Sequence, residues 1–275
     1  MIDLLLTAGS IEYDDTGTGT TIVFLHGLVM DGSLWDGPVA ELSGDHRCVV
    51  PTLPFGAHRR AMNADADLSL PGIARLVEEF LDQLDLQDVT LVGNDTGGAL
   101  VQLIDSPRVG RIVLVSCEAF DNLPPGLTGR TLALVSKLSP GLLGVFMQQL
   151  RLRFVRRLPI TFGWLTKRGD AATVAWIRPL LEQPEIRRDA VRVLRAAFAD
   201  RNLLIKAAER LRSFDRPALV VWAAGDRVMP PEHGRRLAEL LPQGRLVEVD
   251  DTSTLIPLDQ PTRLSHLIKE FIHSS

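Results

Sequence analysis

The chain has 275 residues, a length that favours one domain with an insertion over two full-sized domains. Hydrophobic residues make up 45% of it and charged residues 23%, which is typical of a globular protein with a large core and excludes a disordered or collagen-like chain. The net charge of −4 argues against nucleic acid as a main partner, because phosphate binding needs a basic face. The only cysteines, Cys48 and Cys117, are predicted to be buried thiols in a reducing compartment.

The beginning of the chain has neither a positively charged stretch nor a long apolar run, and eighteen consecutive apolar residues occur nowhere. We therefore expect a cytoplasmic protein with no integral membrane segment. Charge is distributed unevenly along the chain. Residues 119–216 contain eighteen Lys and Arg against eight Asp and Glu, a net charge of +10, whereas the rest contains twelve against twenty-six, a net charge of −14. This middle part also consists of apolar stretches with many arginines, separated by the breakers Pro140, Pro159, Pro179 and Pro184, and is predicted to be a helical insertion.

Strands and helices are predicted to alternate on both sides of this insertion. Continuous apolar runs predict strands at 11–13, 21–25, 47–50, 89–93, 111–116, 218–222 and 245–249. Amphipathic stretches predict helices at 33–42, 72–84, 231–241 and 261–273, with another directly after residue 97. Apolar strands that alternate with helices are typical of an α/β fold with a mostly parallel sheet. We expect a core of residues 1–118 and 217–275, interrupted by a helical unit of residues 119–216.

One turn between a predicted strand and a predicted helix carries a chemical signal. In Gly93-Asn94-Asp95-Thr96-Gly97 a carboxylate occupies the centre of the turn, and glycines on both sides allow the backbone to bend sharply. The positive end of the following helix is expected to keep Asp95 ionised and to offer the Thr96 amide as a donor. An ionised, accessible carboxylate is a nucleophile for carbon. The alternative is that Asp95 simply caps the helix.

The context of this turn favours the chemical interpretation. His26-Gly27 ends an earlier predicted strand, and Gly225-Asp226 follows a later one. Together these segments resemble the α/β-hydrolase fold, and Gly-Asn-Asp-Thr-Gly-Gly resembles its aspartate-nucleophile branch, which contains haloalkane dehalogenases and epoxide hydrolases. The resemblance implies an eight-stranded, mostly parallel sheet with an inserted helical cap. It also implies an Asp that attacks carbon, a histidine that activates water to release the ester, and no metal or cofactor.

The resemblance assigns further roles residue by residue. The backbone amides of Leu28 and Thr96 would stabilise the oxyanion, which requires no particular side chain. Asp226 occupies the position of the triad acid, and its alternative role is to cap the segment that follows it. His26 belongs to the oxyanion motif, where a structural role is favoured over a catalytic one.

The sequence departs from the family pattern at the triad histidine. Counted back from the proline that begins the last predicted helix, Thr254 stands where the histidine belongs, and no histidine lies between His233 and His266. A threonine hydroxyl does not accept a proton at neutral pH, so the expected general base is missing. An ester formed at Asp95 would therefore persist.

Three explanations for the missing base remain open. His58, on the loop after the strand at 47–50, could supply the base. Alternatively, Asp95 acts as a general base whose pKa is raised by Asp226, Asp250 or Asp251, which would favour elimination, isomerisation or cyclisation. In the third explanation the chain is a ligand-binding protein that has lost catalysis.

Other residues bear on the substrate. A tryptophan that holds the halide usually follows the nucleophile of a dehalogenase, whereas Thr96 is found here. Epoxide hydrolases of the usual kind use two cap tyrosines, whereas Tyr13, in a predicted N-terminal strand, is the only tyrosine of the chain. Both subclasses are disfavoured. Trp164 and Trp176 are candidates for lining a pocket, with a place in the core of the cap as the alternative.

The arginines of the insertion allow several interpretations. Their positive charge favours docking of the cap onto the acidic core. They form a solvated face, or they attract an anionic substrate or an acidic partner. A membrane surface is disfavoured, because the sequence shows no clear companion stripe of exposed Trp or Phe. The arginines considered are Arg151, Arg153, Arg156 and Arg157. A homodimer is a further alternative that the sequence does not decide.

Taken together, the sequence predicts an enzyme that acts on a small, largely apolar molecule, most simply by hydrolysis.

Overall fold

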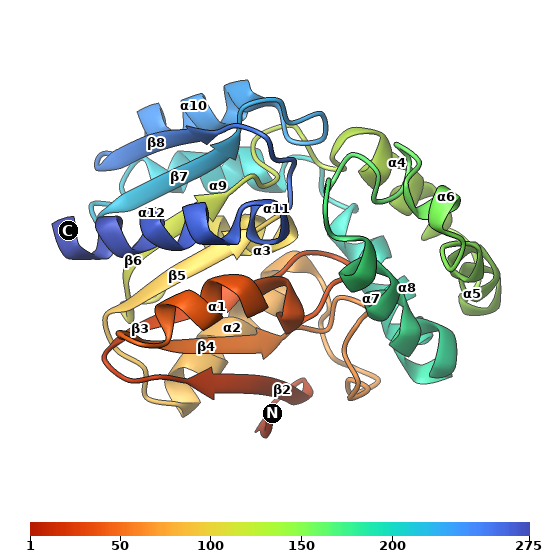
Figure 1. Cartoon of the computed structure of the whole chain (residues 1–275). Helices are drawn as coiled ribbons and strands as arrows, with labels where there is room; N and C mark the ends of the chain where they lie inside the picture. The colour runs from red at the N-terminus through yellow and green to blue at the C-terminus, as the bar shows by residue number, and fades with distance from the viewer.

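The computed structural model describes all residues of the chain, 1–275. An eight-stranded sheet forms its centre, and every strand predicted from the sequence is present (Figure 1). An additional strand, β1, begins the chain and was not predicted. The strands are β1 (Ile2–Leu6), β2 (Gly9–Thr16), β3 (Thr20–Leu25), β4 (His46–Thr52), β5 (Val89–Asn94), β6 (Val109–Val115), β7 (Ala218–Ala223) and β8 (Gly244–Val249).

The strand order of the sheet is β1-β2-β4-β3-β5-β6-β7-β8. The pairs β1/β2 and β2/β4 are antiparallel, and every other neighbouring pair is parallel. The strands β3, β5, β6 and β7 therefore end at one edge of the sheet. Loops that follow parallel strands at this edge are where such folds place their sites.

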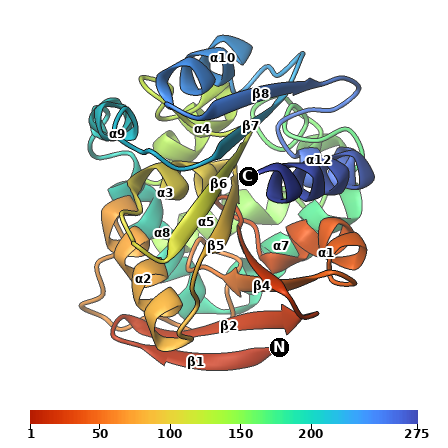
Figure 2. The same cartoon turned by 90° about the vertical axis from the view of Figure 1, so that its left-hand side faces the viewer.

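Helices cover both faces of the sheet, which explains why its central strands are mostly apolar (Figure 2). On one face α1 packs against α12, and on the other α2 and α9 pack against α3. The predicted helix at 33–42 is a 3-10 turn, η1 (Gly32–Trp35), followed by α1. The core helices are α1 (Asp36–Leu42), α2 (Leu70–Gln83), α3 (Thr96–Leu103), α9 (Leu203–Leu211), α10 (Pro231–Leu240), α11 (Ile256–Asp259) and α12 (Pro261–Ser274).

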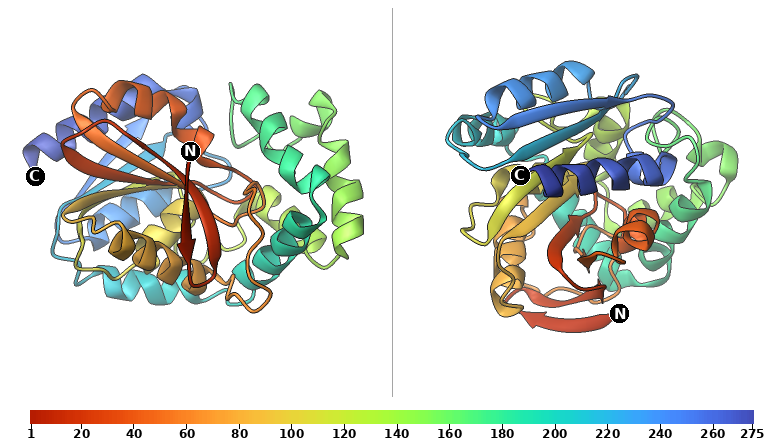
Figure 3. Two further views of the ribbon diagram at one scale, coloured as in Figure 1. Left: turned by 90° about the horizontal axis from the view of Figure 1, so that it is seen from below. Right: turned by 60° about the vertical axis from the view of Figure 1, so that its left-hand side comes forward.

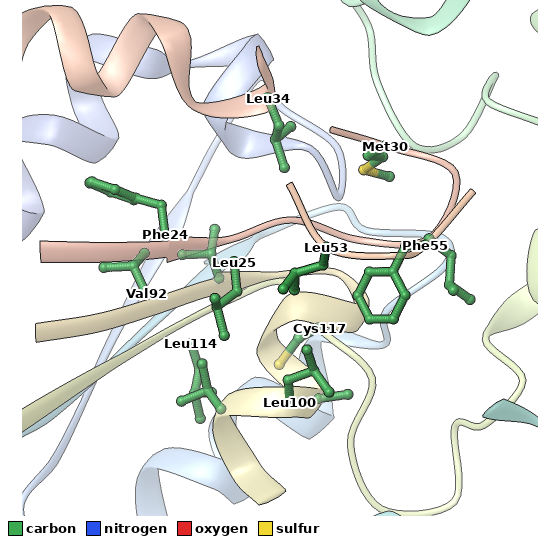
Figure 4. Close-up of a cluster of buried hydrophobic side chains, with 14 of the residues drawn as sticks. Phe24, Leu25, Met30, Leu34, Leu53, Phe55, Val92, Leu100, Leu114 and Cys117 are labelled. Carbon is green, nitrogen blue, oxygen red and sulfur yellow. The ribbon is translucent and has the colours of Figure 1, made fainter. Parts of the chain in front are cut away.

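Apolar side chains pack on both faces of the sheet near its carboxyl edge. In Figure 4 Phe24 of β3 lies near Val92 of β5, whereas Leu25 of β3 lies on the other face of the sheet, with Leu114 of β6 and Leu100 of α3; all five are buried. Burying a side chain of this size contributes about 1.5–3 kcal/mol, so these contacts fix the strand ends firmly. Both cysteines are buried free thiols, as predicted.

Five further helices lie beyond the carboxyl edge of the sheet and cover it as a cap (Figures 1 and 3). They follow β6, as expected for the predicted insertion. Pro140 and Pro184 stand at the first turn of their helices, whereas Pro179, predicted to be a breaker, lies inside α7 near its end. The helices are α4 (Gly126–Val135), α5 (Pro140–Gln149), α6 (Arg153–Arg156), α7 (Asp170–Glu182) and α8 (Pro184–Ala197).

The predicted insertion of residues 119–216 extends further than the cap helices. Its last helix, α9, packs against α3 and α10 of the core. Its apolar stripe, with Leu204, Ala207 and Leu211 buried, faces the core as in any sheet-flanking helix. We therefore propose that the cap ends after α8 and that α9 belongs to the core. Positive charge alone did not distinguish the two, because the exposed side of α9 is also basic.

Candidate active site

Asp95 lies on a sharp turn between β5 and α3. Its backbone adopts φ 54° and ψ −132°, a conformation that non-glycine residues rarely accept, and its side chain makes no capping hydrogen bond with α3. The turn needs Gly97, because a Cβ atom there would lie 2.1 Å from the Leu25 carbonyl oxygen. The strained turn is maintained although the side chain does not cap the helix. This geometry is typical of a nucleophile elbow.

Two backbone amides face the Asp95 carboxylate, those of Leu28 and Thr96, and both favour its ionised form. They are the two amides that the resemblance assigned to the oxyanion site. Gly27 makes this approach possible, because a Cβ atom there would lie 2.0 Å from Asp95 Oδ2. The loop after β3 and the elbow after β5 thus meet at the carboxylate.

Asp95 is nonetheless not held fully ionised. Burial raises the pKa of its carboxyl to about 7, and the negative charge of Asp226 adds to the increase, while the amides of Thr96 and Leu28 offset part of it. The expectation that the helix end keeps Asp95 ionised is therefore wrong, because the loss of water outweighs the helix end. Asp226 contributes as one sequence alternative proposed, whereas Asp250 and Asp251 are exposed.

Asp226 lies beside Thr254, the residue that the resemblance placed at the position of the missing histidine. The Thr254 hydroxyl donates to Asp226 Oδ1 at 2.9 Å, and the amides of Val228 and Met229 donate to the same oxygen. Burial raises the pKa of Asp226 to about 6 despite these bonds. Asp226 Oδ2 is buried without a partner. The two residues that the resemblance assigned to the acid and histidine positions are thus hydrogen-bonded to each other.

Glu118 is a third buried carboxyl, which the sequence analysis missed. It follows β6 by two residues, is 1% exposed, and accepts a hydrogen bond from the Thr96 hydroxyl at 2.8 Å. Burial and the negative charge of Asp95 raise the pKa of Glu118 well above its usual value. Its Oε2 atom has no hydrogen-bond partner. Its position just past a parallel strand end was the available signal, but the predicted insertion began at the next residue.

A cavity lies between the sheet edge and the cap. Asp95 and Glu118 are the only ionisable side chains that line it; no His, Tyr, Trp, Lys or Arg does. Its cap side is formed by apolar side chains of α4, α5 and the loop after α6: Leu132, Phe146, Met147, Leu150, Phe162 and Leu165. The cavity therefore suits a largely apolar molecule with one reactive group.

The threonines on the cap side do not change this character. The Thr128 hydroxyl donates to the carbonyls of Pro159 and Thr161, and the Thr161 hydroxyl donates to Val155 and Arg156 carbonyls. The Thr131 hydroxyl donates to a carbonyl of its own helix. Because these hydroxyls are occupied by backbone acceptors, they brace the cap.

His58 does not lie at the cavity. Its Nδ1 accepts a hydrogen bond from the Gly56 amide at 3.2 Å, and its Nε2 lies 3.7 Å from a carboxylate oxygen of Asp189 on α8. Both side chains are buried. His58 is therefore not placed at the cavity to replace the missing base; it joins the loop after β4 to the cap.

His26 has the structural role that was favoured for it. Its Nε2 accepts a hydrogen bond from the Leu53 amide at 2.8 Å, and its Nδ1 lies 3.0 Å from the Gly27 carbonyl oxygen. Burial lowers its pKa to about 4, so the ring is neutral at pH 7. His26 thus fixes the loop that carries the Leu28 amide.

Neither candidate tryptophan lines the cavity. Trp176 is fully buried, packs against Phe162, and donates from Nε1 to the Ser33 hydroxyl at 2.9 Å, which joins α7 to the core. Trp164 is partly buried, with the Arg227 guanidinium over its ring. Both tryptophans therefore pack between cap and core, which agrees with the alternative that they are structural residues.

The four arginines considered for an anionic substrate also lie outside the cavity lining. Arg156 is buried and donates to cap carbonyls and to Asp170, and Arg153 and Arg157 lie near the same carboxylate. Arg151 is exposed. Backbone amides are therefore the groups at the cavity that remain to bind an anion. The structure also contains no group of three or more His, Cys, Asp or Glu side chains that could hold a metal ion.

Known proteins agree with this architecture. Residues 22–267 match the Alpha/beta hydrolase family, and the chain belongs to that family. It is 28% identical over 271 residues to haloalkane dehalogenase 2 of Mycobacterium tuberculosis, an alignment that covers 95% of this chain and 91% of the relative.

Solved structures show the same fold. A crystal structure of an ancestral haloalkane dehalogenase superposes with a TM-score of 0.78 at 20% identity, covering 100% of this chain and 99% of the other. A thermophilic esterase from Thermogutta terrifontis superposes with a TM-score of 0.73 at 20% identity, covering 99% and 98%. These likenesses establish the fold and leave the reaction to be argued from the site.

Proposed function

We propose that this protein is a hydrolase that uses Asp95 as a nucleophile on a small, largely apolar molecule. One observation carries the proposal: the Asp95 carboxylate faces the amides of Leu28 and Thr96 at a strained elbow and lines an apolar cavity. The similarity to a haloalkane dehalogenase supports a carboxylate nucleophile at this position.

The first half-reaction forms an ester. Asp95, roughly half ionised at neutral pH, attacks an electrophilic carbon; a new C–O bond forms and the bond from that carbon to its leaving group breaks. The leaving group departs with the bonding electrons. Desolvation in the apolar cavity makes the ionised carboxylate a stronger nucleophile than it is in water.

The second half-reaction requires a base, and Glu118 is the carboxyl best placed to supply it. When Asp95 becomes a neutral ester, its negative charge no longer raises the pKa of Glu118. Glu118 then ionises more readily and accepts a proton from a water that attacks Asp95 Cγ. The amides of Leu28 and Thr96 stabilise the resulting oxyanion. Cleavage of the ester C–O bond returns the carboxylate, and the proton passes to the product alcohol.

A halide is not the leaving group that this site favours. The position after the nucleophile carries Thr96, whose hydroxyl donates to Glu118, and the cavity lining contains no tryptophan or other side-chain N–H donor. An ester or an epoxide is therefore favoured over an alkyl halide. Attack on an epoxide leaves the alkoxide attached to the substrate, whereas attack on the acyl carbon of an ester releases an alkoxide and joins the acyl group to Asp95 as a mixed anhydride. The cavity has no tyrosine to protonate either alkoxide, so Glu118, whose raised pKa keeps it protonated, supplies that proton and is then ionised for the second half-reaction.

A second function follows from the pKa of Asp95. A base is most effective when its pKa is close to the working pH, and the Asp95 carboxyl has a pKa of about 7. Asp95 would then remove a proton from carbon and catalyse elimination, isomerisation or cyclisation. No covalent ester would form, and no atom of water would enter the product.

Mass spectrometry of the intact protein distinguishes the two functions. We expect a panel of esters and epoxides to yield a covalent adduct that accumulates in Glu118→Gln and is absent in Asp95→Asn. After turnover in ¹⁸O-labelled water, the peptide that contains Asp95 should carry the label, because water attacks Cγ. Turnover without adduct or label would overturn the nucleophilic mechanism and favour the general-base function.

Thr128→Val provides a matched control, because it alters a cavity residue without touching a carboxyl. It should leave adduct formation and labelling as in the wild type. Tight binding of panel compounds without adduct or product would instead favour a ligand-binding protein.

A further inference from the structure

The segment from Asn122 to Gly169 is unusual in its charge. It contains no Asp or Glu and eight basic residues. Of these, Arg130, Lys137 and Arg151 are exposed and form no ion pair. A surface without acidic residues carries a positive potential that its own side chains do not neutralise.

Exposed apolar side chains gather on the same segment. It holds eight of the thirteen large apolar side chains that are exposed in the whole chain, and Phe154 is 70% exposed. Large apolar side chains that gather on one face mark a surface that contacts something. The eight are Leu127, Leu134, Leu142, Val145, Leu152, Phe154, Leu158 and Ile160.

These residues lie on the cap, most of them in or beside α4, α5 and α6. In Figure 1 α5 and α6 form the outer edge of the cap, α4 lies at its top, and the C-terminus is at the opposite end of the molecule. The inner sides of α4 and α5 form the cavity wall through Leu132 and Phe146. Ile160 lines the cavity and is also 42% exposed. One thin layer of helices thus separates this outer face from the cavity.

From this arrangement we infer that the outer face of α4–α6 docks onto an anionic lipid bilayer. A short helical layer that combines protruding apolar side chains with Lys and Arg matches the interface of such a bilayer, where the apolar groups enter the headgroup region and the cations meet lipid phosphates. A second copy of this chain fits less well, because two faces of equal positive charge repel each other. The structure has no helix long and apolar enough to span a membrane.

A membrane surface was disfavoured from the sequence because no exposed apolar residues were seen beside the arginines. Phe154 and its exposed neighbours are such residues. In the sequence these residues are scattered among buried ones, and only the fold shows that they are exposed together on the cap. Docking would bring the Ile160 side of the cavity close to the bilayer, from which an apolar substrate can enter without crossing water. This inference goes beyond the proposed reaction and does not depend on the chemistry at Asp95.

Flotation with lipid vesicles tests the inference. The wild type should float with vesicles of phosphatidylcholine mixed with phosphatidylglycerol, should bind pure phosphatidylcholine vesicles far more weakly, and should be released by salt. Lys137→Gln combined with Arg151→Gln should weaken binding roughly 25-fold, at about five-fold per cation. Phe154→Ser should weaken it by roughly ten-fold or more.

Matched controls lie far from the cap. Leu5→Ser removes an apolar side chain of β1 that is 73% exposed, and Arg263→Gln removes an exposed cation of α12. Both should bind vesicles as the wild type does. The inference is overturned if the wild type does not float with anionic vesicles, if all variants bind equally, or if the cap variants change only self-association measured by sedimentation. Circular dichroism of each variant confirms that the fold is retained.

Discussion

The two walls of the cavity differ in how their polar atoms are used. On the sheet side, Asp95 and Glu118 face the cavity with their pKa values raised by burial, and no cation neutralises them. On the cap side, the hydroxyls of Thr128, Thr131 and Thr161 donate to backbone carbonyls, and the wall that remains is apolar. The comparison teaches that the sheet edge carries reactivity, whereas the cap determines which molecules reach it.

The largest effect is expected from restoring the missing histidine base on the sheet side of the cavity. In Thr254→His, an imidazole would replace the hydroxyl that now donates to Asp226 Oδ1 at 2.9 Å. A positioned base contributes roughly 10²–10⁴-fold, so release of the Asp95 ester should accelerate by that order. Single-turnover measurement of adduct decay tests this. A folded variant whose adduct decays at the wild-type rate would contradict the assignment of Thr254 to the histidine position.

The stability of the protein should depend on pH because of two buried carboxyls on the sheet side. The carboxyls of Asp95 and Asp226 have raised pKa values, about 7 and about 6, so the folded state binds protons more tightly than the unfolded chain. Their contribution to stability is complete below the unfolded pKa near 4 and is lost as pH rises through 6 to 7. For Asp95, whose pKa is raised from 3.8 to about 7, the full loss is on the order of 4 kcal/mol.

Urea denaturation at pH 5 and pH 8 measures this loss. Asp95→Asn should show a smaller decrease in unfolding free energy between the two pH values than the wild type, because one titrating group is gone. Asp250→Asn, at an exposed position, should decrease as the wild type does. Equal pH dependence in Asp95→Asn and wild type would show that burial does not raise this pKa.

The cap wall should alter selectivity without altering chemistry. Phe146→Ala removes an aromatic ring from the cavity wall on α5. We expect the ratio of kcat/KM between two substrates that differ by one methylene to change roughly ten-fold in favour of the larger one. Adduct formation should be unchanged, and so should labelling of the Asp95 peptide after turnover in ¹⁸O-labelled water. A uniform loss on both substrates would contradict a role in selection.

The smallest effect is expected at the contact that joins the walls. Trp176→Phe removes the hydrogen bond from Nε1 to the Ser33 hydroxyl and should cost about 1 kcal/mol of unfolding free energy. A double-mutant cycle with Ser33→Ala isolates the coupling between the two side chains. Fully additive losses would show that this hydrogen bond does not join cap and core.

The sequence predicted the sheet side better than the cap side. The elbow and the loop after β3 are short and have fixed spacing, so Asp95, Thr96 and Leu28 are found where they were expected. Glu118 was missed because a lone glutamate after a strand carries no motif.

The cap was harder to predict because its contacts join residues far apart in the chain. His58 lies in a loop whose sequence suggests exposure, yet Asp189, more than a hundred residues later, buries it. Trp176 is an apolar residue of α7 and Trp164 is one of the loop before it, and the sequence does not reveal which side of a thin cap faces the cavity. Helical periodicity identifies a buried face but not the partner that buries it.

Gly27 has a consequence for how this site can change over time. A Cβ atom at this position would lie 2.7 Å from the Cβ atom of Asp95 as well as 2.0 Å from its Oδ2. Shortening residue 95 to serine or cysteine would therefore remove one of these clashes and leave the other. Substitution of the nucleophile is sterically open on this scaffold, whereas substitution of Gly27 is closed whichever nucleophile the elbow carries. An engineer who wishes to give the cavity a new chemistry should therefore vary residue 95 and keep the glycine that faces it.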